Sequence, residues 1–202
     1  MELINKKVFD YINDVDSILP APGGGSVASL VGALGVSLAK MLAHFSIEKK
    51  KFKEASNDKK EKFILAFKEL DYYKDILVKG VDDDAISYES VVDAFKSKDE
   101  DAINRALLTS AMVAYDIQDA SLNAIYYVEK LIELGNKNLY SDLISAAILL
   151  AACNEMASLN VVANAKGLKN EELKNEYLSK TEYSTKKAKQ LKTKIIKIIN
   201  TL

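Results

Sequence analysis

Residues 19–43 read LPAPGGGSVASLVGALGVSLAKMLA and consist of a turn followed by a helix-forming run. Pro20 and Pro22 stop any helix that precedes them, and three glycines extend the loop. From Ser26, which we predict to be the N-cap, apolar and small residues continue without a helix breaker. The small side chains lower helix propensity but let neighbouring helices approach closely. The stretch therefore predicts a buried helix over residues 26–46.

The remainder of the chain repeats apolar residues at helical spacing and contains few breakers, with two prolines and eight glycines among 202 residues. This pattern predicts further helices, separated by short breaks, over residues 3–17, 57–96, 100–134, 139–165 and 171–199. Short connections make neighbouring helices antiparallel. We therefore predict an all-α fold, an up-and-down bundle of about six long antiparallel helices, in one domain over residues 1–202.

Lysine and arginine total 28 against 29 aspartates and glutamates, which leaves a formal net charge of −1. Such a balance exerts no general attraction on nucleic acid, so we predict no nucleic-acid partner. The lone Cys153 cannot form an intrachain disulfide and is predicted to be a small buried apolar residue. Because no signal-peptide pattern follows Met1 either, we predict a cytoplasmic location.

The most apolar stretch, Val27–Phe45, is about as long as a membrane span. It contains Lys40 and His44, however, and it is rich in glycine, alanine and serine. We therefore predict a buried helix there and no membrane partner.

The turn at Gly23, Gly24 and Gly25 leads into Ser26, so backbone N–H groups without helical partners converge at the predicted helix start. Such groups can bind an anion or a carboxylate, and these four residues are candidates for substrate binding. The segment is not a P-loop, because the Gly-Lys-Ser/Thr sequence is missing and nothing before it reads as a strand. The residues are equally consistent with a flexible hairpin between two helices.

Five motifs follow one another along the chain and together span nearly all of it. They are LPAPGGGSVASLVGALGVSLAKMLA at 19–43, KKKF at 49–52, VDDDA at 81–85 followed by Tyr88, GN…SDL at 135–143 and NVVAN at 160–164. The ordered set resembles the formiminotetrahydrofolate cyclodeaminase family, which also includes stand-alone methenyltetrahydrofolate cyclohydrolases. Asp116 stands where that family usually has proline, and a second family proline near residue 98 is absent. These departures bear on local helix geometry and on the substrate.

Three consecutive aspartates, Asp82, Asp83 and Asp84, lie on a predicted helix whose apolar stripe runs from Leu77 to Phe95. At about 100° per residue, Asp84 lies roughly 60° from the centre of the stripe, Asp82 about 100° from it and Asp83 nearly opposite. Asp84 is therefore expected at the edge of the packed face, where a cleft would lie. The resemblance implies that Asp84 is the catalytic, proton-transferring residue. A charged surface run is the alternative.

A second predicted helix places Asp142, Asn160 and Asn164 within roughly 40° of one another in projection. One carboxylate and two carboxamides suit a pterin, which offers both hydrogen-bond donors and acceptors. Together with Asp82, these residues are predicted to orient Asp84 and the pterin. Alternatively, Asp142 caps its helix and the asparagines bond between helices.

Lys49 and Lys50 are predicted either to attract the glutamate tail of the substrate or to form a solvated basic face. His44 is the only histidine, so the sequence offers no histidine cluster for a metal. We predict no metal and no cofactor besides the tetrahydrofolate substrate. His44 itself is predicted to pack or to interact with the helix dipole.

The resemblance implies an enzyme that forms or hydrolyses 5,10-methenyltetrahydrofolate, either a cyclohydrolase or a formiminotetrahydrofolate cyclodeaminase. It also implies acid/base catalysis by an aspartate, a small-molecule folate substrate and a homodimer with long helices packed between subunits. The competing interpretation is a non-catalytic helical bundle that binds folate or acts as a protein-interaction module.

Overall fold

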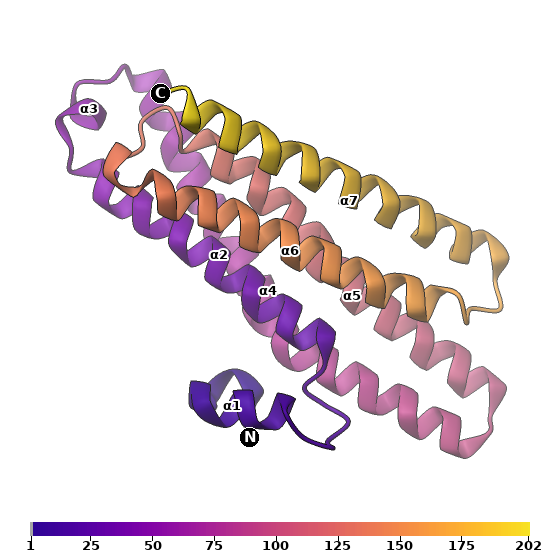
Figure 1. Cartoon of the computed structure of the whole chain (residues 1–202). Helices are drawn as coiled ribbons and strands as arrows, with labels where there is room; N and C mark the ends of the chain where they lie inside the picture. Colours follow the sequence, from indigo (N-terminus) through magenta and orange to yellow (C-terminus); the bar gives the residue numbers. More distant parts are fainter. Residues whose placement is uncertain (1) are drawn as a thin grey trace.

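The structure, a computed structural model, describes residues 2–202, and within that range it contains helices and no strand. Its elements, in chain order, are η1 (Leu3–Asn5), α1 (Val8–Val15), α2 (Gly24–Ile47), α3 (Lys50–Lys53), α4 (Asn57–Ser97), α5 (Glu100–Lys130), η2 (Lys137–Leu139), α6 (Tyr140–Ala165) and α7 (Glu171–Asn200) (Figure 1). The predicted all-α class is confirmed. Five helices are long, whereas the expected sixth, near the N-terminus, has only eight residues.

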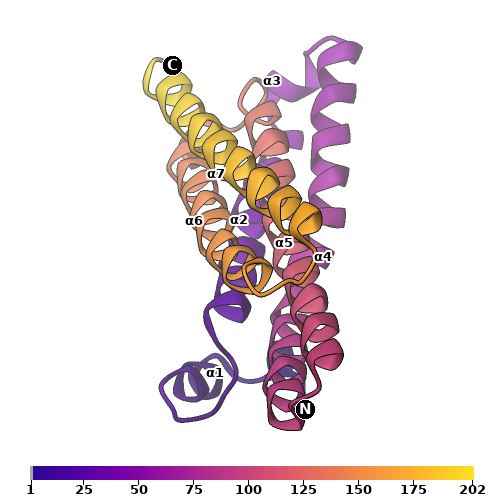
Figure 2. The same cartoon turned by 90° about the vertical axis from the view of Figure 1, so that its right-hand side faces the viewer.

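Four long helices enclose the core. α2 packs against α4 and α6, and α5 packs against the same two helices from the other side. α7 lies across α5 and α6 on the outside of this group (Figure 2). The two short helices lie at opposite ends of α2, α1 beside its beginning and α3 just beyond its end (Figure 1).

Close contact between α2 and α6 explains the small residues of the 26–46 stretch. A Cβ on Gly32 would lie 2.7 Å from the Cys153 sulfur, and a Cβ on Gly35 would lie 3.1 Å from the Ala146 carbonyl oxygen. Cys153 is fully buried, as predicted. Glycine at these two positions therefore lets the helices approach more closely than any larger residue would allow.

The N-terminal helix predicted over residues 3–17 is broken, and the predicted bounds are wrong. The backbone N–H groups of Leu3 and Ile4 both donate to the Asp82 carboxylate of α4. These contacts hold the first turn as the short η1, and α1 begins only at Val8. A long-range hydrogen bond has thus overridden the local helical pattern.

The N-cap prediction for Ser26 is also wrong. α2 begins at Gly24, and its N-cap is Gly23, which has an extended backbone and no side-chain cap. Ser26 lies inside the first turn, where backbone N–H groups have no partner within the helix. These groups are available to an acceptor from elsewhere in the fold.

Two helical segments, Gly24–Ile47 and Lys137–Ala165, are long and apolar enough by length and composition to cross a membrane. Core helices of folded proteins pass the same test, because burial inside a protein also selects apolar residues. Of the most apolar window, 61% is buried in the first segment and 44% in the second. Lys40, buried on α2, pairs with Asp71 of α4 and lies 4.3 Å from the centroid of the Phe67 ring.

Candidate active site

A carboxylate from α4 occupies the N-terminus of α2. The Ser26 backbone N–H donates to Asp84 Oδ2 at 2.8 Å. A Cβ on Gly25 would lie only 2.0 Å from Asp84 Oδ1, so any larger residue at position 25 would displace the carboxylate. The first turn of α2 thus receives a negative charge from another helix, at the end where the helix dipole favours it.

Burial raises the pKa of Asp84 above its usual value, and the hydrogen bond from the Ser26 N–H opposes part of this rise. A carboxyl with a raised pKa holds a proton more readily near neutral pH, which suits a group that must accept a proton and return it. Perturbed pKa values of this kind concentrate at functional sites. Asp84 therefore has the environment expected of an acid/base residue.

Asp84 lies on the wall of a cavity of about 310 Å³. The other residues that line it are Pro20, Ala21, Gly23, Gly24 and Gly25 at the start of α2, Tyr88 of α4, Ser110 of α5, and Asn160, Ala163 and Asn164 of α6. The volume is at the lower end of the roughly 300–1,000 Å³ typical of small-molecule sites. The structure thus brings the glycine turn, Asp84 and both asparagines together around one space.

The polar side chains of this wall are connected. Asn164 Nδ2 donates to Ser110 Oγ at 3.0 Å, and Ser87 Oγ lies 3.3 Å from the same Ser110 oxygen. Ser87 Oγ also donates to the backbone carbonyl of Asp84 at 2.9 Å. A chain of contacts therefore runs from α6 through α5 to the turn of α4 that carries Asp84. Asn160 Nδ2 bonds only weakly within its own helix, at 3.3 Å.

Ser26 supports Asp84 from behind and does not line the cavity. Its side chain is fully buried, and its hydroxyl lies 2.9 Å from the Tyr11 hydroxyl. Tyr11 is the single buried residue of α1, so this contact attaches α1 to α2. Burial raises the pKa of Tyr11; the hydrogen bond with Ser26 lowers it, and the charges of Asp84 and Asp82 raise it further. The phenol therefore stays protonated and can donate a hydrogen bond.

Asp82 does not reach the Asp84 cavity. Its carboxylate accepts hydrogen bonds from the Leu3 and Ile4 backbone N–H groups, and it lines a separate hollow between α4 and the N-terminal segment. The neighbouring Asp83 pairs with Lys79 on the same helix. The contacts of Asp82 are those of a residue that holds the N-terminal segment, and the structure does not group it with Asp84 at one cavity.

Lys49 and Lys50 lie at the other end of the bundle from Asp84. Both follow the last residue of α2, and the helix from Gly25 to Ile47 spans roughly 33 Å at 1.5 Å per residue. Lys49 lines a hollow with the last turn of α2, and Lys50 lies 3.7 Å from Glu54 on the surface. Within one chain neither lysine shares the cavity, contrary to the predicted grouping.

Asp142 is also distant from the cavity. It lies in the first turn of α6, 18 residues before Asn160, which corresponds to roughly 27 Å along the helix. The projection that grouped Asp142 with the asparagines identified a common face but ignored the rise along the axis. Within one chain Asp142 therefore does not share the cavity with Asn160 and Asn164, and its predicted role toward the pterin stays a prediction.

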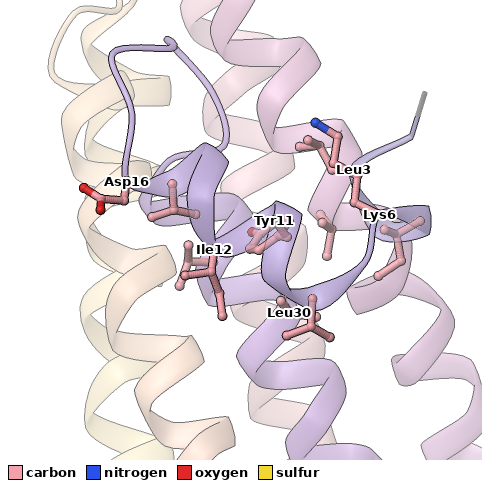
Figure 3. Close-up of a pocket in the computed structure, with 11 residues that line it drawn as sticks. Leu3, Lys6, Tyr11, Ile12, Asp16 and Leu30 are labelled. Carbon is pink, nitrogen blue, oxygen red and sulfur yellow. The ribbon is translucent and has the colours of Figure 1, made fainter.

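A larger cavity, of about 620 Å³, lies between α1 and the flank of α2 and α4 (Figure 3). Tyr11, Ile12 and Leu30 surround it, while the Asp16 carboxylate points away from it. Lys6 at its rim is paired with Asp14. Most of the side chains that line this space are apolar and Asp84 does not reach it, so the smaller cavity is the candidate active site.

Three residues around Asp84 escaped identification as site residues from the sequence. Tyr88 follows Asp84 by four residues, so helical spacing places the two on one face and could have identified it. Ser110 lies on α5 outside every motif of the sequence, and no local pattern around it indicates a site residue. Tyr11 meets Ser26 only because the N-terminal segment folds back, which no local pattern indicates.

Among residues 2–202, no group of three or more histidine, cysteine, aspartate and glutamate side chains is placed to hold a metal ion. His44 packs edge-on against Phe67, with ring centroids 4.8 Å apart. The expected lack of a metal and of a cofactor stays a prediction.

Known proteins align with nearly the whole chain. Methenyltetrahydrofolate cyclohydrolase of Methylorubrum extorquens is 29% identical over 187 residues, which are 88% of either chain. Formimidoyltransferase-cyclodeaminase of Gallus gallus is 28% identical over 197 residues, which are 93% of this chain and 36% of that longer protein. The crystal structure of formiminotetrahydrofolate cyclodeaminase from Thermotoga maritima matches with a TM-score of 0.90 and 28% identity, over 99% of this chain and 98% of the other. The sequence pattern of formiminotransferase-cyclodeaminase matches residues 7–183, and the chain belongs to this family.

Proposed function

We propose that the protein is a folate one-carbon enzyme that forms or hydrolyses 5,10-methenyltetrahydrofolate, with Asp84 as the residue that transfers protons. The substrate class is supported by the relatives, whose names specify methenyltetrahydrofolate or formiminotetrahydrofolate. The assignment of Asp84 rests on one observation: its carboxylate is buried on the wall of a small-molecule-sized cavity and is held there by the Ser26 N–H.

In the hydrolytic direction, water adds to the cationic carbon that bridges N5 and N10. Asp84 takes a proton from the attacking water, and a tetrahedral carbon forms. The bond from this carbon to N5 then breaks, Asp84 returns its proton to N5, and loss of the hydroxyl proton leaves the 10-formyl group. The ionised carboxylate also stabilises the positive charge of the bridge before attack.

In the deaminating direction, N10 attacks the N5-formimino carbon and ammonia leaves. Asp84 accepts the proton released by N10 and delivers it to the departing nitrogen. Both reactions therefore need one carboxyl that cycles between its two protonation states. Burial raises the pKa of Asp84 and so makes the carboxylate a better proton acceptor than an exposed aspartate. The Asn160 and Asn164 amides are suited to bond the polar edge of the pterin, and the Tyr88 ring offers an apolar face beside it.

The test is turnover by the purified protein. Loss of the near-ultraviolet absorbance of methenyltetrahydrofolate reports hydrolysis, and its appearance from 5-formiminotetrahydrofolate reports deamination. Asp84→Asn should lower turnover by about 10²-fold or more, because it keeps the shape of the side chain but cannot carry a proton.

The matched control is Asp83→Asn, at the adjacent position, where the carboxylate pairs with Lys79 on the surface. This variant should keep wild-type turnover. Equal turnover in the two variants would remove Asp84 from the mechanism. Binding of the folate without any turnover by the wild-type protein would favour the competing folate-binding module.

We also propose that the protein is a cytoplasmic homodimer. The buried lone Cys153 suits a reducing compartment, and exposed apolar side chains on α1 and α2 suit contact with another subunit. Sedimentation velocity at micromolar concentration tests the dimer, which should sediment at twice the chain mass of 22.3 kDa. Fractionation of the source cells tests the location.

A further inference from the structure

The side-chain amide of Asn164 is held in one orientation on the wall of the Asp84 cavity. Its Nδ2 donates to the Asn160 backbone carbonyl at 2.9 Å and to Ser110 Oγ at 3.0 Å. A backbone carbonyl can only accept a hydrogen bond, so the nitrogen of the amide, and not its oxygen, must face it. Both N–H groups of Asn164 are then used inside the protein.

The amide oxygen of Asn164 is the atom left for a ligand. Oδ1 receives no hydrogen bond within residues 2–202 and, unlike the Oδ1 of Asn154, it is not shut away from solvent. Asn164 lines the cavity that Asp84 also lines. The wall therefore offers a hydrogen-bond acceptor at this point.

A count of hydroxyl protons shows why Ser110 accepts from Asn164. Ser87 has a single hydroxyl proton, and the backbone carbonyl of Asp84, 2.9 Å away, can only accept. The Ser87 oxygen is then free to accept the proton of Ser110 across their contact of 3.3 Å. All protons of the chain point one way, from Asn164 through Ser110 and Ser87 to the Asp84 backbone, and such chains strengthen each bond in them.

We propose that Ser110 is a positioning residue for substrate binding, which holds the Asn164 amide with Oδ1 facing the cavity as a fixed acceptor for an N–H group of the pterin. The inference rests on the proposed function, since the ligand is the reduced pterin of the folate. It gives a role to a residue of α5 that lies outside every motif of the sequence.

The burial of Ser110 supports this role. Its side chain lies on α5 and is only 5% exposed, so water has little access to replace its hydroxyl. Without that hydroxyl, one N–H of Asn164 would lose its partner, and the amide would keep only the bond to its own helix. The Asn164 oxygen would then no longer be fixed against rotation.

A reduced pterin matches a fixed acceptor, because its ring and its amino group carry several N–H donors. Asn160, one helical turn before Asn164, adds a second amide on the same face of α6. The Nδ2 of Asn160 makes only a weak bond of 3.3 Å, to the Met156 carbonyl. A site that presents fixed acceptors rejects a ligand that lacks the matching donors, because the acceptors would stay unpaired.

Binding of tetrahydrofolate to the intact protein, measured by anaerobic titration calorimetry, tests the proposal without requiring turnover. Ser110→Ala should weaken binding about tenfold, the effect of one hydrogen bond. The KM for methenyltetrahydrofolate should rise by a similar factor. We expect kcat to change less than threefold, since the contact between Ser26 and Asp84 is untouched.

A double-mutant cycle shows whether Ser110 acts through Asn164. Asn164→Ala should weaken tetrahydrofolate binding at least as much as Ser110→Ala does. In the Asn164→Ala background, Ser110→Ala should then change the affinity less than twofold, because its partner is already gone. Independent, multiplying losses would mean that the serine hydroxyl meets the ligand by itself, and would overturn the positioning role.

The matched control is Ser121→Ala, on the same helix. Ser121 Oγ also accepts a hydrogen bond from an asparagine of α6, Asn154, at 3.1 Å. It lies 11 residues after Ser110, roughly 16 Å along the helix axis, and does not line the cavity. Its loss should lower Tm much as the loss of Ser110 does and leave the tetrahydrofolate affinity unchanged. Equal losses of affinity in both variants would reduce Ser110 to a packing residue.

The thiol variant Ser110→Cys keeps the size of the side chain and a weak acceptor, so its affinity should lie between those of the wild type and Ser110→Ala. Affinity below that of Ser110→Ala would contradict an acceptor role. Wild-type affinity in Ser110→Ala would overturn the inference and leave the proposed function standing. Tetrahydrofolate binding with the expected losses, but without turnover by the wild type, would support the inference and contradict the proposed reaction. A wild-type protein that binds no tetrahydrofolate would overturn both.

Discussion

The Ser26 amide and the Asp84 carboxylate are 58 residues apart in the chain and are joined by a hydrogen bond of 2.8 Å. Through this bond α4 supplies the acceptor that α2 lacks at its N-terminus, since Gly23 has no side chain to cap the helix. The same contact fixes the orientation of a carboxylate that would otherwise rotate. One hydrogen bond therefore caps the start of α2 and also holds the Asp84 carboxylate in place for its proposed chemical role.

Gly25→Ala is the sharpest test of this arrangement. The added Cβ would lie 2.0 Å from Asp84 Oδ1, so the carboxylate must move away from the Ser26 N–H. We expect turnover to fall by about 10²-fold, comparable to loss of the acid/base group itself. Methenyltetrahydrofolate absorbance measures the effect.

The control is Gly24→Ala, one residue earlier in the same turn, where an added Cβ meets nothing within 4 Å. Gly24 also lines the cavity, so the added methyl group should act on substrate binding and appear in KM, while kcat should fall much less than in Gly25→Ala because the Asp84 carboxylate keeps its place. Equal losses at positions 24 and 25 would mean that the turn itself, and not the Asp84 carboxylate, responds to the substitution.

Tyr11→Phe tests the attachment of α1. The substitution removes the hydroxyl that lies 2.9 Å from Ser26 Oγ but keeps the buried ring. The loss should cost about 1 kcal/mol and lower Tm by roughly 2–4 °C. Tyr183→Phe, at a side chain that is 66% exposed, should leave Tm unchanged. A Tm equal to that of the wild type would show that the hydroxyl contact contributes nothing to stability.

The raised pKa of Asp84 predicts a pH dependence of stability. A carboxyl whose pKa is higher in the folded state than in the unfolded state favours folding while it is protonated. This contribution is complete below the unfolded value of 3.8 and is lost as pH rises through the folded pKa. In Asp84→Asn this pH-dependent loss of stability is absent, because the amide does not titrate.

Urea unfolding at pH 4 to 7 measures the effect. The free energy of unfolding of Asp84→Asn should rise relative to that of the wild type as pH increases, because only the wild type must bury a charge. Comparison of the two proteins cancels the contributions of other partly buried carboxyls to the pH dependence. Examples are Asp116 and Asp119, whose pKa values are also raised by burial. A difference that stays constant with pH would contradict the raised pKa.

Much of the fold was accessible from the sequence because helices depend on local patterns. The long helices from α4 to α7 begin and end within a few residues of the predicted bounds, where Asp99 and Asn170 cap the starts of α5 and α7. The N-terminal helix was not predictable in the same way. Its bounds depend on contacts between Leu3 and Asp82, and no local pattern encodes a partner 79 residues away.

The candidate site was predictable in part, for a related reason. Helical projection placed Asp84 at the edge of the packed face, and the structure puts it on a cavity wall. A helical projection gives the angle of a residue around the helix axis but not its position along the axis. It therefore grouped Asp142 with Asn160 although they lie at opposite ends of α6. Ser110 carried no local signal, because its place on the wall depends on how α5 packs against α4 and α6.

Cys153 provides a probe of the core that is independent of catalysis. It is fully buried, and burial raises its pKa to about 12, so neither access nor ionisation favours reaction. The native protein should therefore react with a disulfide reagent such as 5,5′-dithiobis(2-nitrobenzoate) only as fast as it unfolds.

The thiol should react within seconds in 6 M guanidinium chloride, which provides the fully exposed reference. Tyr183→Phe, at an exposed side chain of α7, should leave the slow reaction of the folded chain unchanged. A Cβ on Gly32 would lie 2.7 Å from the sulfur, so α2 and α6 are too close at this point to admit a reagent. Fast labelling of the native wild-type protein would therefore show that the two helices separate locally without global unfolding.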